Sequence, residues 1–488
     1  MARYKKLRGF DVKFLTGNDE FGQKNAQAAE ERGLSPQEHV DDLSKSFKNM
    51  AKAFDVDYDI FWRTTDPVHQ RAVQKIFRKL HDSGDIYKGS YEGLYCTPCE
   101  AFFTESQLKD GKCPDCNREV KLTSEEAYFF RMSKYQDRLM KHIEENPEFI
   151  LPESRKNEMI NNFLKPGLED LCVSRTTFKW GIPVDFDPDH VVYVWIDALT
   201  NYANALGFMS DDDSEYKKYW PADVHVVGKE IIRFHTLIWP TILMALGEPL
   251  PKRIFGHGWL TLEGRKMSKS VGNTIDPFML ANRYGSDAVR YFLMREFVWG
   301  SDGDFKYDSL LNHINADLAN DLGNLLSRTV GMIEKYFGGE LPDSSAGGEY
   351  DADLKSMAAA MPEKVESHMD KMEFSLALGE IWNVIRRANK YADENKPWEL
   401  FKDETKKNEL ANVLYHMAET IRIISVAIGF VMPNTPAKIR EQLNIDDHID
   451  WESAKKFGLL PRRVKISKGD VLFPRLDVEK EKAELMKK

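Results

Sequence analysis

The fold class follows from two apolar runs, Val191-Val192-Tyr193-Val194-Trp195-Ile196 and Val224-His225-Val226-Val227. Each run has the length of a buried strand and precedes a polar turn and a helical pattern. Near the start of the chain, residues 11–16 form a strand candidate, followed by the polar loop Gly17-Asn18-Asp19-Glu20 and a helical run from Lys24 to Arg32. This alternation predicts an α/β fold with a parallel sheet covered by helices on both faces and a site at the carboxyl ends of the strands.

Outside these segments the pattern changes twice. Residues 91–121 hold short strand candidates around paired cysteines, which predicts a module inserted into the α/β domain. After about residue 300 the strand patterns stop, and apolar residues recur at helical spacing, as in Phe374–Tyr391 and Leu410–Val431. The last third of the chain is therefore predicted to be a helical bundle.

Composition narrows the class of protein only coarsely. The 488 residues are too many for one core, and 42% hydrophobic with 30% charged residues is ordinary for a soluble globular protein. No export signal and no apolar stretch of about eighteen residues occurs, so we expect a cytoplasmic protein with no membrane partner. The net charge of −10 argues against a non-specific nucleic-acid coat, although not against one local RNA-binding patch.

Four of the five cysteines form two C-x-x-C pairs, Cys96 with Cys99 and Cys113 with Cys116, thirteen residues apart. In a chain without an export signal this spacing favours a metal site over disulfides, and each pair can supply half of a tetrahedral thiolate site. We therefore predict one structural Zn²⁺, because four thiolates leave no open coordination position. The fifth cysteine, Cys172, stands alone and is expected in the core.

A second local motif is Lys266-Met267-Ser268-Lys269-Ser270, which follows the apolar segment Ile254–Trp259. Two lysines three residues apart on a loop suit the stabilisation of charge that develops on a phosphate during displacement. On its own, the motif is equally compatible with a solvated basic surface loop. Neither a Walker A string nor a G-x-G-x-x-G string occurs, so the sequence gives no support for a P-loop or dinucleotide site.

Together with its surroundings, this motif resembles the nucleotide loop of class I aminoacyl-tRNA synthetases, and of the methionine enzymes in particular. The resemblance includes Gly17-Asn18-Asp19-Glu20, the segment from Val194 to Tyr202, the segment from Gly228 to His235, and Gly256-His257-Gly258-Trp259 before the lysine motif. It implies a Rossmann-like catalytic domain and the ligation of methionine to tRNA(Met), with methionine, ATP and tRNA(Met) as partners and no DNA.

The resemblance places methionine among Trp195, Ala198, Tyr202, Ile231 and His235, with Asp19 facing its ammonium group. Aromatic walls suit a polarizable thioether, and a carboxylate suits a positive amino group. The alternative is that Trp195 and Tyr202 are ordinary core aromatics. We favour the pocket because Trp195 is expected where a strand turns at the mouth of the sheet.

The resemblance also implies an ATP site and the catalytic residues. ATP would contact Lys229, Glu230, His257, Lys266, Ser268 and Lys269. Glu230 would bind the ribose, and Mg²⁺ would accompany ATP. Lys266 and Lys269 would be catalytic, with Lys269 stabilising the transition state as the methionine carboxylate attacks the α-phosphorus.

In the helical bundle the resemblance implies an anticodon site at Asn324, Arg328 and Trp398. Asn324 and Arg328 lie one helical turn apart and so share a face. Hydrogen bonding and stacking on an unstacked base are the usual means of reading single-stranded RNA. Without the resemblance, two polar helix residues and one tryptophan would not indicate such a site.

These inferences divide the chain into six expected segments. They are the first part of the catalytic domain (1–90), an inserted connective module with a zinc knuckle (91–187), the second part of the catalytic domain (188–250), a stem-contact region with the lysine motif (251–305), the anticodon-binding bundle (306–455) and a C-terminal extension (456–488).

The sequence departs from the family at its start. The family's H-x-G-H motif and first central strand have no counterpart, so we expect a Rossmann-like sheet lacking its first strand and a truncated chain with poor activity as given. Phe21 stands where the family has a histidine, and its side chain cannot hydrogen-bond. The alternatives are a catalytically inactive tRNA-binding paralogue and another class I synthetase, for leucine, isoleucine, valine or cysteine.

Overall fold

The computed structural model describes residues 1–98, 101–103, 105, 108–114, 116–176, 178–267, 273–344 and 346–485. They form two compact units, which we name the α/β unit and the helical unit. The α/β unit consists of Lys13–Asn49 and Tyr58–Gly258. The helical unit consists of Met1–Val12, Met50–Asp57 and Trp259–Lys488.

Two parallel sheets organise the α/β unit. In the first, β1 (Leu15–Asn18) pairs with β2 (Ile60–Arg63). In the second, β12 (Ile254–His257) lies between β11 (His225–Gly228) and β6 (Ile150–Leu151). Parallel strands separated by helices confirm the predicted α/β fold. The helices of this unit are α2 (Gln23–Glu31), α3 (Pro36–Ala53) as far as Asn49, α4 (Pro67–Asp82), α5 (Gln136–Glu145), α6 (Glu153–Met159), α7 (Val194–Asn204), α8 (Ser214–Tyr219) and α9 (Trp239–Leu246).

The sequence predicts one strand at residues 191–196, and this prediction is wrong. The first two residues of this run end strand β10 (Asp187–Val192), and its last three, from Val194, begin α7. Strand β10 also pairs antiparallel with β8 (Ser174–Arg175) and β9 (Pro183–Val184), so it belongs to neither parallel sheet. The run misleads because α7 is buried along most of its length, and a short apolar run reads alike in a buried strand and a buried helix.

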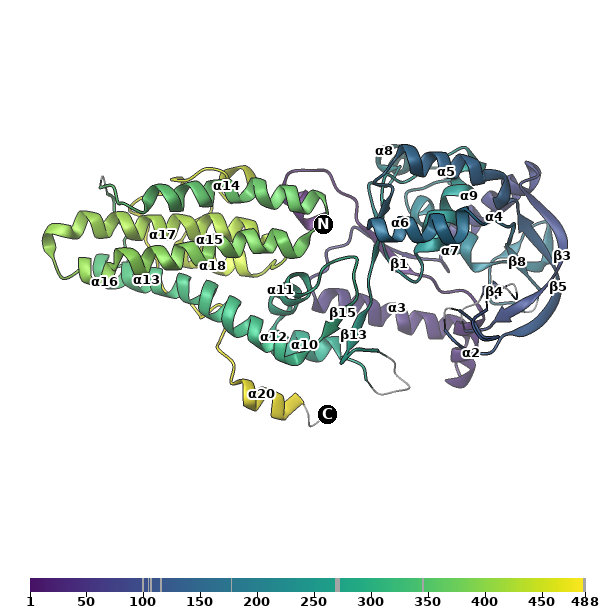
Figure 1. Ribbon diagram of the computed structural model, residues 1–488, viewed down its shortest axis with the longest axis horizontal. Helices are drawn as coiled ribbons and strands as arrows, with labels where there is room; N and C mark the ends of the chain where they lie inside the picture. The colour runs from purple at the N-terminus through teal and green to yellow at the C-terminus, as the bar shows by residue number, and fades with distance from the viewer. Residues whose placement is uncertain are drawn as a thin grey trace. The chain divides into compact units, whose positions relative to one another are not determined.

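The cysteine pairs are attached to longer strands than the sequence predicted. Strands β3 (Ile86–Cys96) and β5 (Lys121–Phe130) form a long antiparallel hairpin, flanked by β4 (Ala101–Phe103) and β7 (Leu171–Cys172). Cys96 is the last residue of β3, so the hairpin carries the cysteine module at its far end (Figure 1).

The helical unit contains the predicted bundle. Helices α14, α15 and α17 run side by side in it (Figure 1). Its helices are α1 (Ala2–Leu7), α10 (Pro277–Tyr284), α11 (Ser286–Glu296), α12 (Tyr307–His313), α13 (Asn324–Phe337), α14 (Asp351–Asp370), α15 (Phe374–Asn395), α16 (Pro397–Leu400), α17 (Lys407–Ala427), α18 (Thr435–Leu443), α19 (Trp451–Ala454) and α20 (Val478–Leu485). A small sheet of β14 (Arg265–Lys266), β13 (Leu260–Leu262) and β15 (Gly303–Phe305) lies in the same unit.

Helix α17 is the core of the bundle. Every residue from Leu410 to Ala427 is buried. Among the described residues, one segment, Glu404–Phe430, is long and apolar enough to cross a membrane by length and composition, but 94% of its apolar window is buried in the protein. We interpret it as the core helix of the bundle.

A buried ion pair in α17 forms hydrogen bonds with the backbone of the later segment 448–460. The side chains of Glu419 and Arg422 are fully buried and 2.8 Å apart. The Glu419 carboxylate also accepts hydrogen bonds from the backbone N–H groups of Gly458, Leu459 and Leu460. Arg422 donates to the carbonyl oxygens of residues 448, 453 and 456. The pair therefore satisfies six backbone groups in the segment 448–460.

Two short segments from early in the sequence complete the helical unit. Tyr4 of α1 is fully buried and packs edge-on against Phe430 and Trp451. Asp55 accepts hydrogen bonds from Ser286 and Asn434. Both lie within the predicted segment 1–90.

Candidate functional site

One face of α7 lines the candidate amino-acid pocket. Trp195, Ala198 and Tyr202 are three and seven residues apart, which places them on one side of the helix. All three are partly exposed, whereas most of their neighbours on α7 are buried. The indole of Trp195 stacks on the ring of Phe234, with 3.5 Å between centroids and 12° between planes. The first turn of a helix, and not the end of a strand, thus presents Trp195.

The second wall of the pocket is the segment that contains Ile231 and His235. His235 lies in a single π-helical turn, Phe234–Ile238, a feature that is frequent at functional sites. Its Nδ1 lies 3.0 Å from the carbonyl oxygen of Ile231, and its Nε2 lies 2.7 Å from the hydroxyl of Tyr202. Because a carbonyl only accepts, Nδ1 carries the proton and Tyr202 donates to Nε2. Burial lowers the pKa of His235 to about 4, so this imidazole is neutral at pH 7.

Asp19 follows β1 and is exposed at the carboxyl end of that strand. Burial raises the pKa of the Tyr202 hydroxyl, and the negative charge of Asp19 raises it further. Such an effect requires Asp19 to lie near the hydroxyl. The charge of Asp19 thus acts on one ring of the candidate pocket.

A second histidine, His225, packs against Tyr202. Its ring is 4.2 Å from the ring of Tyr202, and it accepts a hydrogen bond of 3.3 Å from the indole N–H of Trp239. Burial and, to a lesser degree, the neighbouring His235 lower the pKa of His225 to about 3. The rings of His225, Tyr202 and Trp239 therefore form an aromatic cluster that is uncharged at neutral pH.

These two histidines predict acid sensitivity of the α/β unit. Their pKa values are lower in the folded protein than in the unfolded chain, so the unfolded chain binds more protons below about pH 6.5. The free energy of unfolding should fall between about pH 6.5 and 4, by up to about 1.4 kcal/mol per pH unit for each histidine. In urea unfolding at several pH values, His225→Gln should show a shallower decline than the unsubstituted protein. Equal slopes for His225→Gln and the unsubstituted protein would contradict this.

A buried contact between His69 and Asp197 holds the start of α7 in place. His69 and Asp197 are both almost fully buried, and Nε2 of His69 lies 2.7 Å from the Asp197 carboxylate. The indole N–H of Trp62 donates to Nδ1 of His69, so the Nε2 proton is directed at Asp197. Burial raises the pKa of Asp197, while His69 opposes the increase. This contact fixes the first turn of α7, the turn that presents Trp195.

The candidate ATP residues lie at the carboxyl ends of two neighbouring parallel strands. Gly228 of β11 is opposite His257 of β12, and the backbone N–H of Lys229 donates to the carbonyl of His257 over 2.9 Å. A Cβ on Gly228 would lie 2.6 Å from the Glu230 carboxylate, so the glycine makes room for this side chain. Lys229, Glu230 and His257 are therefore adjacent, at the edge where α/β sheets bind ligands.

Glu20 and Phe21, next to Asp19, are structural. The Glu20 carboxylate accepts hydrogen bonds from Arg63 and Thr65. Phe21 is buried, with its ring 5.1 Å from the ring of Trp180. An apolar side chain at position 21 is thus accommodated by packing.

The lysine motif follows a tight hairpin. Strands β13 and β14 are joined by Glu263 and Gly264, both with positive φ. Lys266 is exposed, and its ammonium group lies 4.1 Å from the centroid of the Trp259 ring. Ser268, Lys269 and Ser270 lie outside the described residues.

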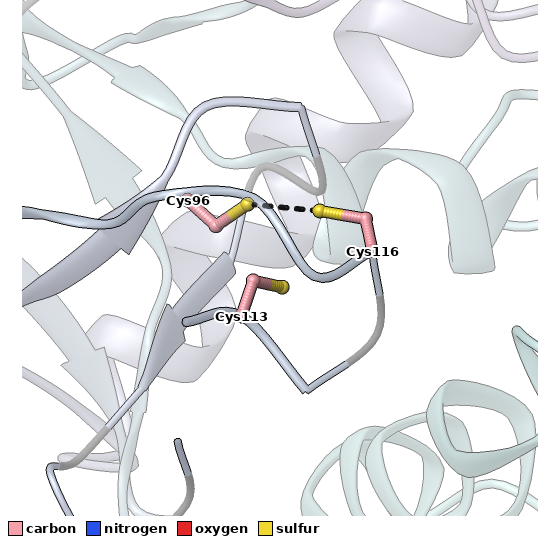
Figure 2. Close-up of side chains that lie close together, drawn as sticks. All are labelled: Cys96, Cys113 and Cys116. Atoms are coloured by element: carbon pink, nitrogen blue, oxygen red, sulfur yellow. Dashed lines mark hydrogen bonds between the residues drawn. The ribbon is translucent and has the colours of Figure 1, made fainter. Parts of the chain in front are cut away.

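Three of the four predicted metal ligands lie close together (Figure 2). The Sγ atoms of Cys96, Cys113 and Cys116 lie within 4.8 Å of one another. Cys96 and Cys113 are buried and Cys116 is partly exposed. Cys99 lies outside the described residues. Three convergent thiols fit a soft or borderline metal ion such as zinc. Cys172 is buried elsewhere, as predicted for a core residue.

Loss of one thiolate should release the metal. We expect Cys113→Ser to retain at most a small fraction of the bound zinc, because a closed tetrahedral site depends on each of its ligands. Metal content by atomic emission would measure this. Cys172→Ser is the matched control and should keep full occupancy. Stoichiometric zinc in Cys113→Ser would mean that the ion binds elsewhere.

The candidate anticodon residues are brought together within the helical unit. Asn324 and Arg328 begin α13, and Trp398 lies in α16. The guanidinium of Arg328 is 5.5 Å from the Trp398 ring and 3.0 Å from Asp393. Asn324 is exposed one turn before Arg328, and the Trp398 side chain is 38% exposed.

Sequence reasoning missed several residues of the candidate pocket. Phe234 and His225 lie within the two segments that were quoted, but no motif marked Phe234 as the stacking partner of Trp195 or His225 as a neighbour of Tyr202. The His69–Asp197 contact joins residues 128 positions apart. Such a contact leaves no periodic signal in a single sequence.

Comparisons with known proteins give one family. A model described as "tRNA synthetases class I (M)" matches residues 1–122 and 118–330, and "Anticodon binding domain of methionyl tRNA ligase" matches residues 341–488. Methionine--tRNA ligase of Caldanaerobacter subterraneus is 61% identical over all of this chain and 76% of that protein. The Bacillus subtilis ligase is 53% identical over 99% of this chain and 74% of that protein. A crystal structure of Mycobacterium tuberculosis methionyl-tRNA synthetase bound by methionyl-adenylate has a TM-score of 0.92 and 42% identity, over 97% of this chain and 94% of that one.

Proposed function

This chain belongs to the methionyl-tRNA synthetase family of class I tRNA synthetases, and we propose from this how its residues divide the reaction. The enzyme activates methionine with ATP to methionyl-adenylate and transfers the methionyl group to tRNA(Met). Membership argues against the leucine, isoleucine, valine and cysteine enzymes. We place the enzyme in the cytoplasm, where translation uses the methionyl-tRNA that it forms.

We assign methionine to the pocket of Trp195, Ala198, Tyr202, Ile231 and His235. The stacked indole, the neutral imidazole and the apolar helix face support this, because they offer aromatic contacts to a thioether without a competing charge. Asp19 receives the substrate ammonium group, and its electrostatic effect on Tyr202 supports that placement.

We assign ATP to Lys229, Glu230 and His257 in the α/β unit and to Lys266, Ser268 and Lys269 of the lysine motif. The adjacency of the first three at two parallel strand ends supports the assignment. Glu230 is suited to the ribose hydroxyls. Lys266 and Lys269 are suited to the charge that develops on the phosphates. Mg²⁺ enters with the ATP phosphates and neutralises part of their charge, and we assign it no protein ligand.

We assign one structural Zn²⁺ to Cys96, Cys99, Cys113 and Cys116, supported by the convergence of three of these thiols. We assign anticodon recognition to Asn324, Arg328 and Trp398, supported by their proximity and by the exposed indole. The six segments expected from the sequence stand as a proposal for how these sites divide the chain.

The observation that carries the methionine assignment is the Trp195–Phe234 stack beside the Tyr202–His235 hydrogen bond. ATP–pyrophosphate exchange with a panel of methionine, leucine, isoleucine, valine and cysteine tests it. Methionine should be favoured at least about a hundredfold, because an aromatic pocket distinguishes these side chains by both shape and polarizability. Comparable exchange with any other member of the panel would refute the assignment.

A further inference from the structure

A second aromatic pair lies beyond the Arg328–Trp398 contact. The rings of Tyr336 and Phe401 are stacked, with 4.1 Å between centroids and 20° between planes. Phe401 comes three residues after Trp398, directly beyond the end of α16. Tyr336 comes eight residues after Arg328 on α13, which is about 12 Å along the helix axis. The two pairs therefore follow one another along the edge that α13 and α16 share.

Phe401 is unusually exposed for a phenylalanine of the bundle. Its side chain is 44% exposed although one face of its ring is covered by Tyr336. A small cavity of about 80 Å³ opens beside the pair and is lined also by Phe337 and Leu400. Trp398 and Phe401 together thus expose two aromatic side chains within one helical turn. Exposed apolar groups that cluster in this way often mark an interaction site.

We propose that Phe401, held by Tyr336, is a stacking platform for an unpaired base of the tRNA anticodon loop, adjacent to the base that stacks on Trp398. This rests on the proposed role of Trp398. Stacking suits an unpaired base because every base has a π-face, so the platform needs no sequence match. Phe401 also lies within the segment that matches the anticodon-binding model, so the proposed surface continues that interface.

Two lysines lie beside the aromatic pair. The ammonium group of Lys335 lies 5.5 Å from the Tyr336 ring, and Lys407 lines the cavity. Both can neutralise backbone phosphates. Asp403 and Glu404 also line the cavity, and the Asp403 carboxylate accepts hydrogen bonds from the N–H and hydroxyl of Thr405. Basic groups beside an exposed ring are the combination that single-stranded nucleic acid requires.

Aminoacylation kinetics of the Phe401 variants test the proposal. Phe401→Ala and Phe401→Leu should lower kcat/KM for tRNA at least about fivefold, whereas Phe401→Trp should retain it, because stacking needs a ring. ATP–pyrophosphate exchange needs no tRNA and should be unchanged in all three. Leu376→Ala is the matched control, since Leu376 is 54% exposed on α15 and far from both aromatic pairs in sequence.

Abasic substitutions in the tRNA identify the base. Each nucleotide of the anticodon loop is replaced in turn, and the loss is measured with the unsubstituted enzyme, Phe401→Ala and Trp398→Ala. At one position the abasic substitution should lower kcat/KM with the unsubstituted enzyme but have no further effect with Phe401→Ala. At a neighbouring position the same should hold for Trp398→Ala only. Unchanged tRNA kinetics in Phe401→Ala, or coupling to the same nucleotide as Trp398, would overturn the inference. Unchanged kinetics in Trp398→Ala alone would instead overturn the proposed anticodon site.

Discussion

Lys269→Ala should lower the rate of methionyl-adenylate formation by about 10²–10³-fold while methionine affinity changes little. Charge on the phosphates rises only as the methionine carboxylate attacks, so an ammonium group placed there stabilises the transition state more than the bound substrates. The loss of one such group removes about that factor from kcat. Pre-steady-state adenylate formation gives the rate, and methionine titration gives the affinity.

Arg265 provides the control for this experiment. It is an exposed cation at the start of β14, one residue before the lysine motif. Arg265→Ala removes a positive charge from the same hairpin and should leave the rate within about twofold, because an exposed charge is screened by solvent. Weak methionine binding at a normal rate in Lys269→Ala would contradict the assigned role of this lysine.

Arg422→Ala should destabilise the helical unit by about 3–5 kcal/mol. The substitution leaves the fully buried Glu419 carboxylate without its ionic partner. It also removes the hydrogen-bond donor for three carbonyl groups of the segment 448–460. Removing one member of a buried pair is costly because the remaining charge is uncompensated. Hydrogen exchange of peptides from α17 in increasing urea should report the loss.

Two further variants sharpen this test. Lys402 and Glu399 form an exposed pair in the same unit, and Lys402→Ala should cost less than about 1 kcal/mol. Replacing Glu419 and Arg422 together by leucine and methionine should remain destabilising. Although an apolar pair avoids the buried charges, the N–H groups of residues 458–460 would lose their acceptor. A double variant as stable as the unsubstituted protein would show that these backbone contacts contribute little.

The sequence was most informative where local pattern and chemistry coincide. Helical spacing predicted the bundle, and the C-x-x-C spacing predicted that Cys113 and Cys116 would meet Cys96. Pattern failed at residues 191–196, because five of these six residues are buried and none is polar enough to distinguish a helix from a strand. It also could not reveal the contact of His69 with Asp197, which only the folded chain brings together.

In the candidate site, too, the sequence identified the residues but not the contacts between them. The segments around Tyr202 and His235 were identified by resemblance, but the protonated nitrogen of His235 follows from the nearby carbonyl of Ile231. Likewise, Trp195 was expected at a strand end and is instead presented by a helix. Which residues form a pocket can be inferred from sequence, whereas how each is oriented depends on neighbours that are distant along the chain.

The contribution of Tyr4 and Asp55 to the helical unit limits how this protein can be dissected. A recombinant fragment that starts at Trp259 would carry the whole bundle by sequence, yet it would lack the ring that fills the space between Phe430 and Trp451. It would also lose the acceptor for Ser286 and Asn434. A fragment made to express the helical unit by itself should therefore include residues 1–12 by fusion, or carry a larger side chain in the place that the Tyr4 ring occupies.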